Sequence, residues 1–255
     1  MSRLVLLATE GVSTNVVYHA LEREFTSVEV IVEDHVPRYQ HLKRRVKKLG
    51  ILTVIGQILF MLLIERPQRK SSARRIEQIT KQFSLQIIPL AGKVTRVVSL
   101  NSEEARSLLK QLNPDLVIIN GTRILAKATL DCITAPIINM HSGITPAYRG
   151  VHGGYWALAE GHPELVGTTV HFVDKGIDTG QIIRQVTTQV TEEDSFVTYP
   201  LLQLGVGVPA LVESARAILA GTVTLQNPLS ALPSRLYSHP TLWRYLVNRM
   251  TKKVK

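Results

Sequence analysis

Residues 137–150 read IINMHSGITPAYRG and residues 167–183 read GTTVHFVDKGIDTGQII, and these two segments decide the expected fold. Each begins as a strand and continues into a loop that contains glycine. Asn139 and His141 end the first strand, and Asp178 lies in the loop after the second. Open α/β sheets present their chemistry in this way, on loops at the ends of buried strands.

Outward from these segments, apolar runs of strand length alternate with helical patterns. This order predicts an α/β fold, a Rossmann-like, mainly parallel sheet with helices on both faces. A basic and apolar helical insert and a short C-terminal extension complete it. We expect strands at 3–8, 28–32, 85–89, 115–119, 136–139, 167–173 and 181–190, and helices from about 14, at 72–82, 102–112, 151–160 and 195–220, with a last helix in the aromatic, basic segment 241–255.

The length of 255 residues suits one sizeable core. We expect one domain over 1–220, with the insert at about 35–80, and an extension over 221–255. The first residues, MSRLVLLATEG, have too short an apolar run for a signal peptide and indicate a strand. A single cysteine, Cys132, excludes an intramolecular disulfide, fits a reducing compartment and favours the cytoplasm.

The net charge of +10 is concentrated in one segment. Residues 38–75 hold eleven Lys or Arg and one acid, Glu65, whereas the remainder holds nineteen basic and nineteen acidic residues. The segment lacks the interleaved aromatic residues of a single-strand nucleic-acid platform, so nucleic acid is not an expected partner.

Between its basic ends, the insert carries the apolar run GILTVIGQILFMLLI at 50–64. Fifteen residues are fewer than the ~20 that span a bilayer. Two interpretations remain open. The run contacts a membrane surface or a lipid-linked substrate through 38–75, which would make the protein membrane-peripheral, or it packs on its own domain with the charges in solvent.

Among catalytic mechanisms, group transfer without a covalent enzyme intermediate is the option that the residue types leave. No G-x-S-x-G elbow is present, and no histidines or cysteines stand at metal-ligand spacing, so no metal is expected. The amide of Asn139 suits an oxyanion, the imidazole of His141 can carry a proton near neutral pH, and the carboxylate of Asp178 can orient that imidazole. On residue types alone, polar groups satisfied within the core are the favoured interpretation of these three residues.

The turn after the first strand offers a second polar site. Gly11, Ser13, Thr14 and Asn15 stand where a strand leads into a helix, and free backbone N–H groups at such a turn bind phosphate or carboxylate. An ordinary polar N-cap explains the same residues. The turn is not G-x-G-x-x-G, so a dinucleotide site is not supported.

The order Asn-x-His, Pro-x-Tyr-Arg-Gly, Gly-Thr-Thr-Val-His-Phe-Val and Gly-Ile-Asp-Thr-Gly resembles the signature of the 10-formyltetrahydrofolate-dependent formyltransferases. The likeness covers about 112–219, and more weakly 3–21. It implies a formyltransferase fold with 10-formyltetrahydrofolate as co-substrate and no metal. It also implies that Asn139 and His141 stabilise the oxyanion, that Asp178 manages protons, and that His171 is a supporting neighbour on the substrate side.

The resemblance extends to the binding residues. It implies a folate pocket between the turn after the fourth strand and the loop that begins at 173. The matching residues are Thr122, Arg123, Ile124, Leu125, Val173 and Asp174. The first loop, Gly11 to Asn15, resembles the loop by which glycinamide ribonucleotide enzymes hold the substrate phosphate.

The expected acceptor is a small-molecule amine that bears phosphate, with an amino sugar on a nucleotide or lipid carrier ahead of phosphoribosylglycinamide of purine synthesis. A tRNA acceptor is disfavoured, because the residues after 221 are too few for the appended barrel domain of that branch. A formyltetrahydrofolate hydrolase and a non-catalytic membrane-peripheral binding protein are the alternatives. The sequence leaves the oligomeric state open.

Overall fold

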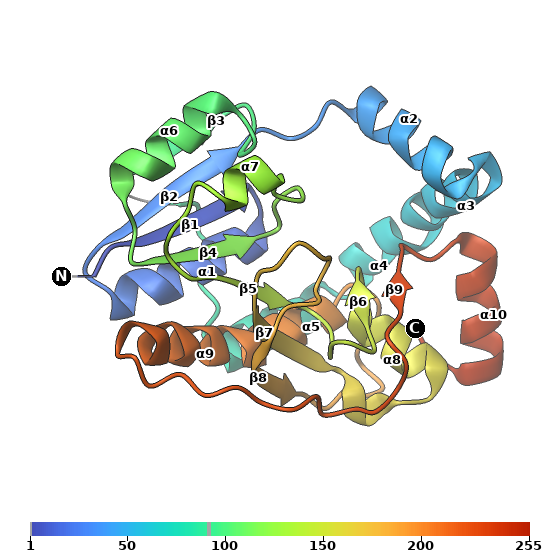
Figure 1. The fold of residues 1–255 in the computed structure, drawn as a ribbon. Coiled ribbons are helices and arrows are strands. Elements are labelled where there is room, and N and C mark those ends of the chain that lie inside the picture. Colours follow the sequence, from blue (N-terminus) through green and yellow to red (C-terminus); the bar gives the residue numbers. More distant parts are fainter. Residues whose placement is uncertain (1, 91–92) are drawn as a thin grey trace.

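The computed structural model describes residues 2–90 and 93–255, and in this part of the chain the centre is a seven-stranded sheet (Figure 1). Its order is β3-β2-β1-β4-β5-β7-β8. The strands are β1 (Leu4–Thr9), β2 (Val28–Glu33), β3 (Val94–Val97), β4 (Leu116–Asn120), β5 (Ile137–His141), β7 (Gly167–Phe172) and β8 (Ile182–Thr187). Strands β1 to β5 pair in parallel, and β7 runs antiparallel to β5 and β8. The expected mainly parallel sheet is confirmed.

Helices cover both faces of the sheet, as Figure 1 shows. On one face, α1 (Val12–Glu24) and α9 (Tyr199–Leu219) pack on the even residues of β1, such as Leu4 and Leu6. On the other, α6 (Glu103–Leu112) and the short α7 (Lys127–Leu130) cover Val5 and Leu7. Because strand side chains alternate between faces, one apolar run supplies two cores.

The structure also corrects one predicted strand. Residues 85–89 form no strand, although they are apolar. Their carbonyl groups face α1 instead: Asn15 Nδ2 donates to the Ile87 oxygen at 3.2 Å, and His19 Nε2 lies 3.3 Å from the Ile88 oxygen. The edge strand β3 comes later, at the more polar Val94–Val97.

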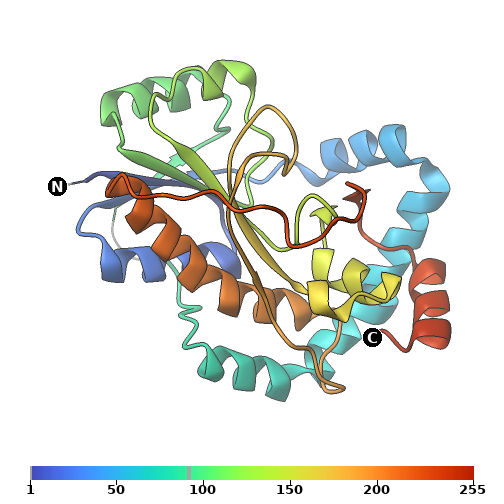
Figure 2. The same ribbon diagram turned by 60° about the horizontal axis from the view of Figure 1, so that its bottom comes forward.

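The insert is helical, as expected, and it forms a chain of helices beside the sheet (Figures 1 and 2). These are α2 (Arg38–Leu49), α3 (Ile51–Phe60), the π-helical turn η1 (Met61–Glu65), α4 (Arg66–Ser71) and α5 (Ala73–Gln82). Among the described residues, two helices have the length and apolar composition to cross a membrane, Ile51–Ser71 and Tyr199–Leu219, and the second of them is the core helix α9. The insert ends in a buried ion pair, in which Arg75 contacts Asp194 through two bonds of 2.8 and 3.0 Å.

The C-terminal extension closes over the insert. After α9, the chain returns along β8, where the Gln226 N–H donates to the Ile182 oxygen at 2.9 Å. It then pairs β9 (Leu236–Tyr237) with β6 (Arg149–Gly150), next to α8 (Gly153–Glu160) and the 3-10 turn η2 (Pro163–Leu165). Finally α10 (Leu242–Lys252) packs on α3. The expected final helix forms, whereas residues 222–226 (TVTLQ), which are strand-like in composition, form no strand.

One buried histidine gives the fold a pH-dependent stability. His152 immediately precedes α8, and its ring lies against the rings of Phe196 and His239; burial lowers its pKa to about 3. The unfolded chain, with an ordinary histidine pKa of ~6.5, therefore binds a proton that the folded chain refuses between these values. Stability is expected to fall as pH drops below about 6.5, by roughly 1.4 kcal/mol per pH unit for this group.

The variant His152→Asn checks this expectation, because Asn tolerates the left-handed backbone that His152 adopts at φ 60°. Urea unfolding at several pH values between 4 and 7 would show a shallower slope in the variant by about one proton. Loss of the ring lowers the free energy of unfolding equally at every pH. Only the slope of that free energy against pH therefore tests the prediction. An unchanged slope would contradict the prediction.

Candidate active site

One face of β5 carries the site. Ile138 and Met140 point into the core under α1 and α9, so Ile137, Asn139 and His141 share the opposite face. His171 of β7 is the direct register partner of Asn139, which places these two side chains next to each other.

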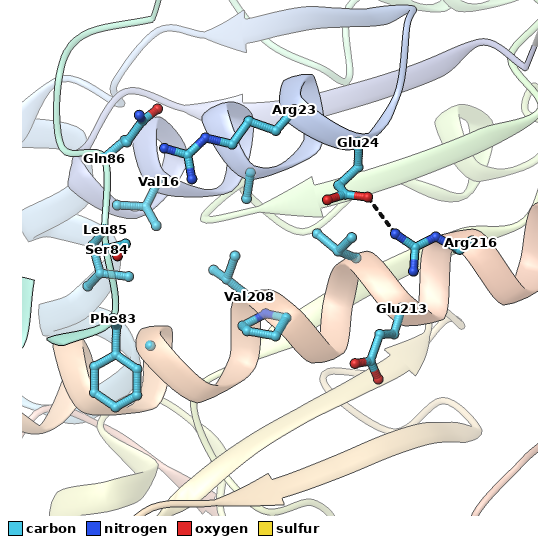
Figure 3. A pocket seen from close by; sticks show the side chains of 14 residues that line it. Val16, Arg23, Glu24, Phe83, Ser84, Leu85, Gln86, Val208, Glu213 and Arg216 are labelled. Carbon is cyan, nitrogen blue, oxygen red and sulfur yellow. Dashed lines mark hydrogen bonds and ion pairs between the residues drawn. The ribbon is translucent and has the colours of Figure 1, made fainter.

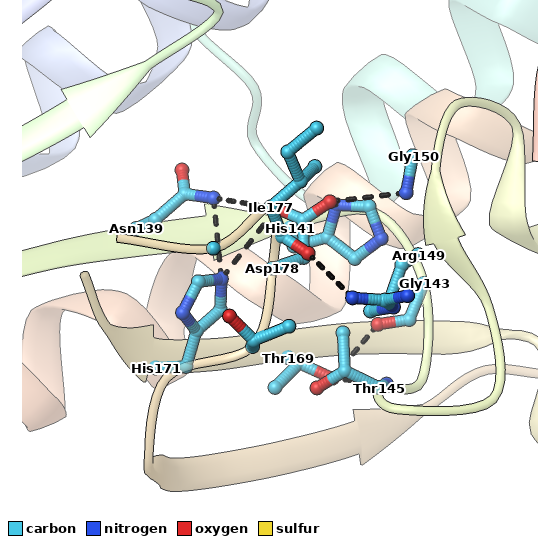
Figure 4. A network of polar contacts seen from close by, with 12 residues as sticks. Asn139, His141, Gly143, Thr145, Arg149, Gly150, Thr169, His171, Ile177 and Asp178 are labelled. Carbon is cyan, nitrogen blue, oxygen red and sulfur yellow. Dashed lines mark hydrogen bonds and ion pairs between the residues drawn. The ribbon is translucent and has the colours of Figure 1, made fainter. Parts of the chain in front are cut away.

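The loop after β7 brings Asp178 onto this face, so the three residues of the predicted trio meet (Figure 4). Its Oδ2 lies 3.4 Å from His141 Nδ1, and its Oδ1 accepts a hydrogen bond from Asn139 Nδ2 at 3.4 Å. The Gly150 N–H donates to Oδ2 at 3.0 Å, and His171 Nε2 stands 3.7 Å from Oδ1. Asp178 holds a left-handed backbone with φ 53°, which aims its carboxylate back at the strand.

His141 is held in one orientation. Its Nε2 lies 2.8 Å from the Tyr148 oxygen, so this nitrogen donates and Nδ1 faces Asp178 with its lone pair. Gly143 allows the close turn, because a Cβ there would lie 2.3 Å from the Tyr148 oxygen and 2.7 Å from His141 Nε2. Burial lowers the pKa of His141, an effect that Asp178 and the Tyr148 carbonyl oppose only in part. The imidazole is therefore neutral at pH 7.

Asp178 stays ionised in the same setting. Burial by itself would raise its pKa, but the polar contact with His171 and the Gly150 N–H, together with the attraction to His141 whenever that ring is protonated, hold the pKa below the ordinary value. A neutral imidazole thus faces a carboxylate, a pair that can take up one proton and share it.

A mainly apolar cavity of about 720 Å³ opens near the same face of β5, although no residue of the trio lines it. Ile137 lines it, two residues before Asn139 on the same face of β5. The predicted cofactor residues Val173 and Asp174 form another wall, and Leu130 and Phe172 add apolar surface. Asp178 also lines a separate cavity of about 370 Å³, so this member of the trio borders open space.

The predicted segment Thr122–Leu125 follows β4, and most of its side chains make contacts within the protein. Arg123 Nε sits 3.2 Å from Glu33 Oε2, and the Arg123 N–H donates to the other oxygen of that buried carboxylate at 2.7 Å. Leu125 is in the core, whereas Ile124 is 67% exposed. A folate contact here stays a prediction, carried by the main chain and Ile124.

The first loop is tied to the same end of β4. Ser13 Oγ donates to Asn120 Oδ1 at 3.0 Å, and Asn120 Nδ2 donates to Thr14 Oγ1 at 3.0 Å. Gly11 precedes α1 without any side-chain cap, so the N–H groups of the first turn remain available to an anion. The side-chain amide of Asn15 is already hydrogen-bonded to the 85–89 segment, as described above. Phosphate binding here stays a prediction.

The cavity drawn in Figure 3 is not part of this site. It measures about 330 Å³ and lies between α1, α9 and residues 83–86. Those helices cover the face of the sheet opposite Asn139 and His141. Within 2–90 and 93–255, no group of three His, Cys, Asp or Glu side chains is placed to hold a metal ion.

Sequence reasoning missed the main-chain part of the site. The Tyr148 carbonyl and the Gly150 N–H orient His141 and Asp178, and the apolar wall at Leu130 was not foreseen. The turn Pro146–Gly150 was visible as a pattern, but backbone partners are set by the path of the turn and carry no signal in side-chain identity.

Comparison with known proteins agrees with this geometry. The sequence model described as formyl transferase matches residues 56–201. A methionyl-tRNA formyltransferase of Anaeromyxobacter sp. (strain K) is 36% identical over 180 residues, which cover 68% of this chain and 53% of that protein. The chain thus spans about half the length of the curated relatives it matches.

Two solved structures share the fold at low identity. Phosphoribosylglycinamide formyltransferase from Streptococcus pneumoniae has a TM-score of 0.56 and 20% identity, covering 86% of this chain and 99% of that one. An N-formyltransferase from Helicobacter canadensis, solved with folinic acid and dTDP-3-aminofucose, has a TM-score of 0.54 and 16% identity, covering 93% and 71%.

Proposed function

The chain belongs to the formyl transferase family, and from this premise we propose that it moves a formyl group from 10-formyltetrahydrofolate to a primary amine. The acceptor we propose is a small phosphate-bearing molecule, an amino sugar on a nucleotide or lipid carrier. One observation carries the proposal: Asn139, His141 and Asp178 meet on one face of β5, the face on which Ile137 also lines a mainly apolar cavity.

The geometry supports a division of labour among the three side chains. Asn139 Nδ2 can donate to the carbonyl oxygen that gains negative charge when the amine attacks. The proton lost by the amine has a place on the pair of Asp178 and His141 Nδ1, which are 3.4 Å apart. From this pair the proton can pass to the donor nitrogen when its bond to the formyl carbon breaks, so the step balances. His141 Nε2–H stays on the Tyr148 carbonyl meanwhile, so the ring does not turn. Long contacts of 3.3 to 3.4 Å around Asn139 leave its amide free to shift to the substrate.

The residues present fit a folate. A cavity of about 720 Å³ has the size of a site for a drug-sized ligand, and its lining combines apolar residues with the charged Lys127, Asp131, Asp174 and Lys175. Main-chain groups of the 173–176 loop at its rim can pair with the polar edge of a pterin. When bound, 10-formyltetrahydrofolate supplies an activated formyl group, and Val173, Asp174 and Ile137 would hold it next to Asn139.

Charge and position support a phosphate-bearing acceptor. The uncapped start of α1 at Gly11 and Ser13 lies beside the Asn120 turn, at the same carboxyl-terminal edge of the parallel strands as Asn139. The similar N-formyltransferase from Helicobacter canadensis was solved with an amino sugar on a nucleotide, which supports the same class here.

Incubation with 10-formyltetrahydrofolate and a panel of amines tests the proposal. The panel holds nucleotide-linked amino sugars, glycinamide ribonucleotide and a no-amine control, and mass spectrometry detects the gain of one carbonyl. We expect the gain on an amino sugar, and no gain with the variant His141→Ala. A gain on glycinamide ribonucleotide alone would assign the purine reaction instead. Folate turnover without any amine would indicate a hydrolase.

A further inference from the structure

We propose that one end of the molecule docks on an anionic phospholipid bilayer and lies in its interfacial region. The docking face consists of the exposed apolar sides of α3 with η1, and of α10. Its main residues are Leu52, Ile55, Leu59 and Leu63, with Leu246 and Met250. In Figure 1 these helices lie together at the end of the molecule farthest from the N-terminus.

The helix α3 and the turn η1 expose their apolar side and bury a polar residue, which is the reverse of a surface helix in water. Leu52, Leu59 and Leu63 are 73%, 37% and 58% exposed, whereas Gln57, on the inner side, is fully buried. From Ile51 to Ile64 the sequence holds no charged residue. A helix at a protein surface normally turns its polar side outward. The inverted pattern is expected where the outer medium is apolar.

The helix α10 continues this face. Trp243, Leu246, Val247 and Met250 follow the three- and four-residue spacing of one helix side and are 48%, 41%, 49% and 75% exposed. The two helices touch at Gly56, where a Cβ would lie 2.2 Å from the Trp243 ring. The two apolar sides therefore join into one patch, larger than the scattered single residues of an ordinary surface.

Positively charged side chains border the apolar patch. On α2, which packs against α3, Lys43, Lys47 and Lys48 are exposed. Beyond η1, the exposed Arg66 and Lys70 follow on α4. Residues 221–255 carry six Lys or Arg and no acid. An apolar patch with a cationic border matches the two layers of an anionic membrane surface, acyl chains below and phosphates above.

The same features argue against other occupants. A symmetric pair of chains would place each cationic border against its own copy. The patch is mainly aliphatic, whereas single-stranded nucleic acid binds on aromatic stacking platforms. A spanning helix would have to leave the body of the protein, and it is held there by Phe60, fully buried, and by Gln57 Nε2, which donates to the His239 oxygen at 2.6 Å.

Vesicle co-sedimentation tests the proposal with the full chain. Wild type is expected to bind vesicles of phosphatidylglycerol and phosphatidylcholine, and at least about tenfold more weakly pure phosphatidylcholine. Trp243 emission should shift to shorter wavelength on binding. The triple variant Leu59→Gln, Leu62→Gln and Leu63→Gln is expected to bind at least about a hundredfold more weakly, because these side chains would lose burial in the acyl region.

A matched triple variant, Ile88→Gln, Val98→Gln and Leu229→Gln, replaces equally exposed apolar residues away from the patch and should bind as wild type does. A charge variant, Lys43→Gln, Lys47→Gln and Lys48→Gln, should lose at least about tenfold. Circular dichroism and melting confirm that each variant folds.

Three results would overturn the proposal. One is failure of the folded wild type to bind the anionic vesicles. Another is binding that the leucine variant leaves unchanged. The last is a dimer in analytical ultracentrifugation that the leucine variant dissociates, because a second copy would then cover the patch. The inference does not depend on the transfer reaction, and the variant His141→Ala is expected to bind vesicles as wild type does.

Discussion

Replacing Asp178 by Asn is expected to lower kcat for formyl transfer by about 10²- to 10⁴-fold, with KM for the folate nearly unchanged. The variant removes the charge that would stabilise a proton on His141 Nδ1, 3.4 Å away. Asn tolerates the left-handed backbone at this position, and its oxygen can still accept the Gly150 N–H, so the loop keeps its path. Steady-state kinetics with the amine identified by the acceptor panel is the measurement.

Asn139→Ala belongs to the same experiment and is expected to cost about 10²- to 10³-fold in kcat, the usual effect of losing one oxyanion donor. The double variant with Asp178→Asn should lose less than the product of the two single effects, since both residues serve one transition state. Thermal unfolding provides the control, and melting temperatures should stay close to wild type. Near-wild-type kcat in a folded Asp178→Asn variant would remove the trio from the mechanism.

The second large effect concerns stability. Phe60→Ala is expected to lower the free energy of unfolding by about 3–5 kcal/mol. The ring is fully buried and meets the rings of Phe196, His239 and Tyr245 edge to face, with centroids 4.8, 5.2 and 4.9 Å away. Its removal leaves a cavity where the insert, the C-terminal extension and the main domain come together.

Leu59→Ala is the matched control, one position along the same helix. Its side chain is 37% exposed on the docking face, so the loss should be about 1 kcal/mol or less. Urea unfolding followed by circular dichroism measures both. Equal, small losses for the two variants would show that the insert is not integral to the folded core.

Local patterns predicted the strands that hold the site. The run Ile137–His141 alternates between two buried faces, and Asn139 and His141 fall on the same one because strand side chains repeat every two residues. The helix expected at 102–112 begins at Ser102, a residue type common at helix N-caps, and its hydroxyl accepts the Ala105 N–H at 3.2 Å. Both signals depend on neighbours within a few residues.

Signals of this kind fail where partners are distant. Residues 85–89 look like a strand by composition, but Asn15 and His19 of α1 take their carbonyl groups. The edge strand of the sheet is formed instead by Val94–Val97. Its place beside β2 depends on pairing within the sheet and not on hydrophobicity. The insert shows the same limit. Its sequence predicted helices, whereas the side of the helix that is buried, with Phe60 and Gln57, depended on packing against the C-terminal extension.

By itself, then, the amino-acid sequence determined the alternating α/β order, the face of β5 that carries Asn139 and His141, and the family signature. Each of these depends only on the types of residues that stand close together in the chain. The tertiary structure alone decided that Asp178 meets His141, that the Tyr148 carbonyl orients the ring, and that the insert leaves leucines in the open. Those outcomes depend on how loops and helices far apart in the chain close on one another, and only the folded packing specifies that.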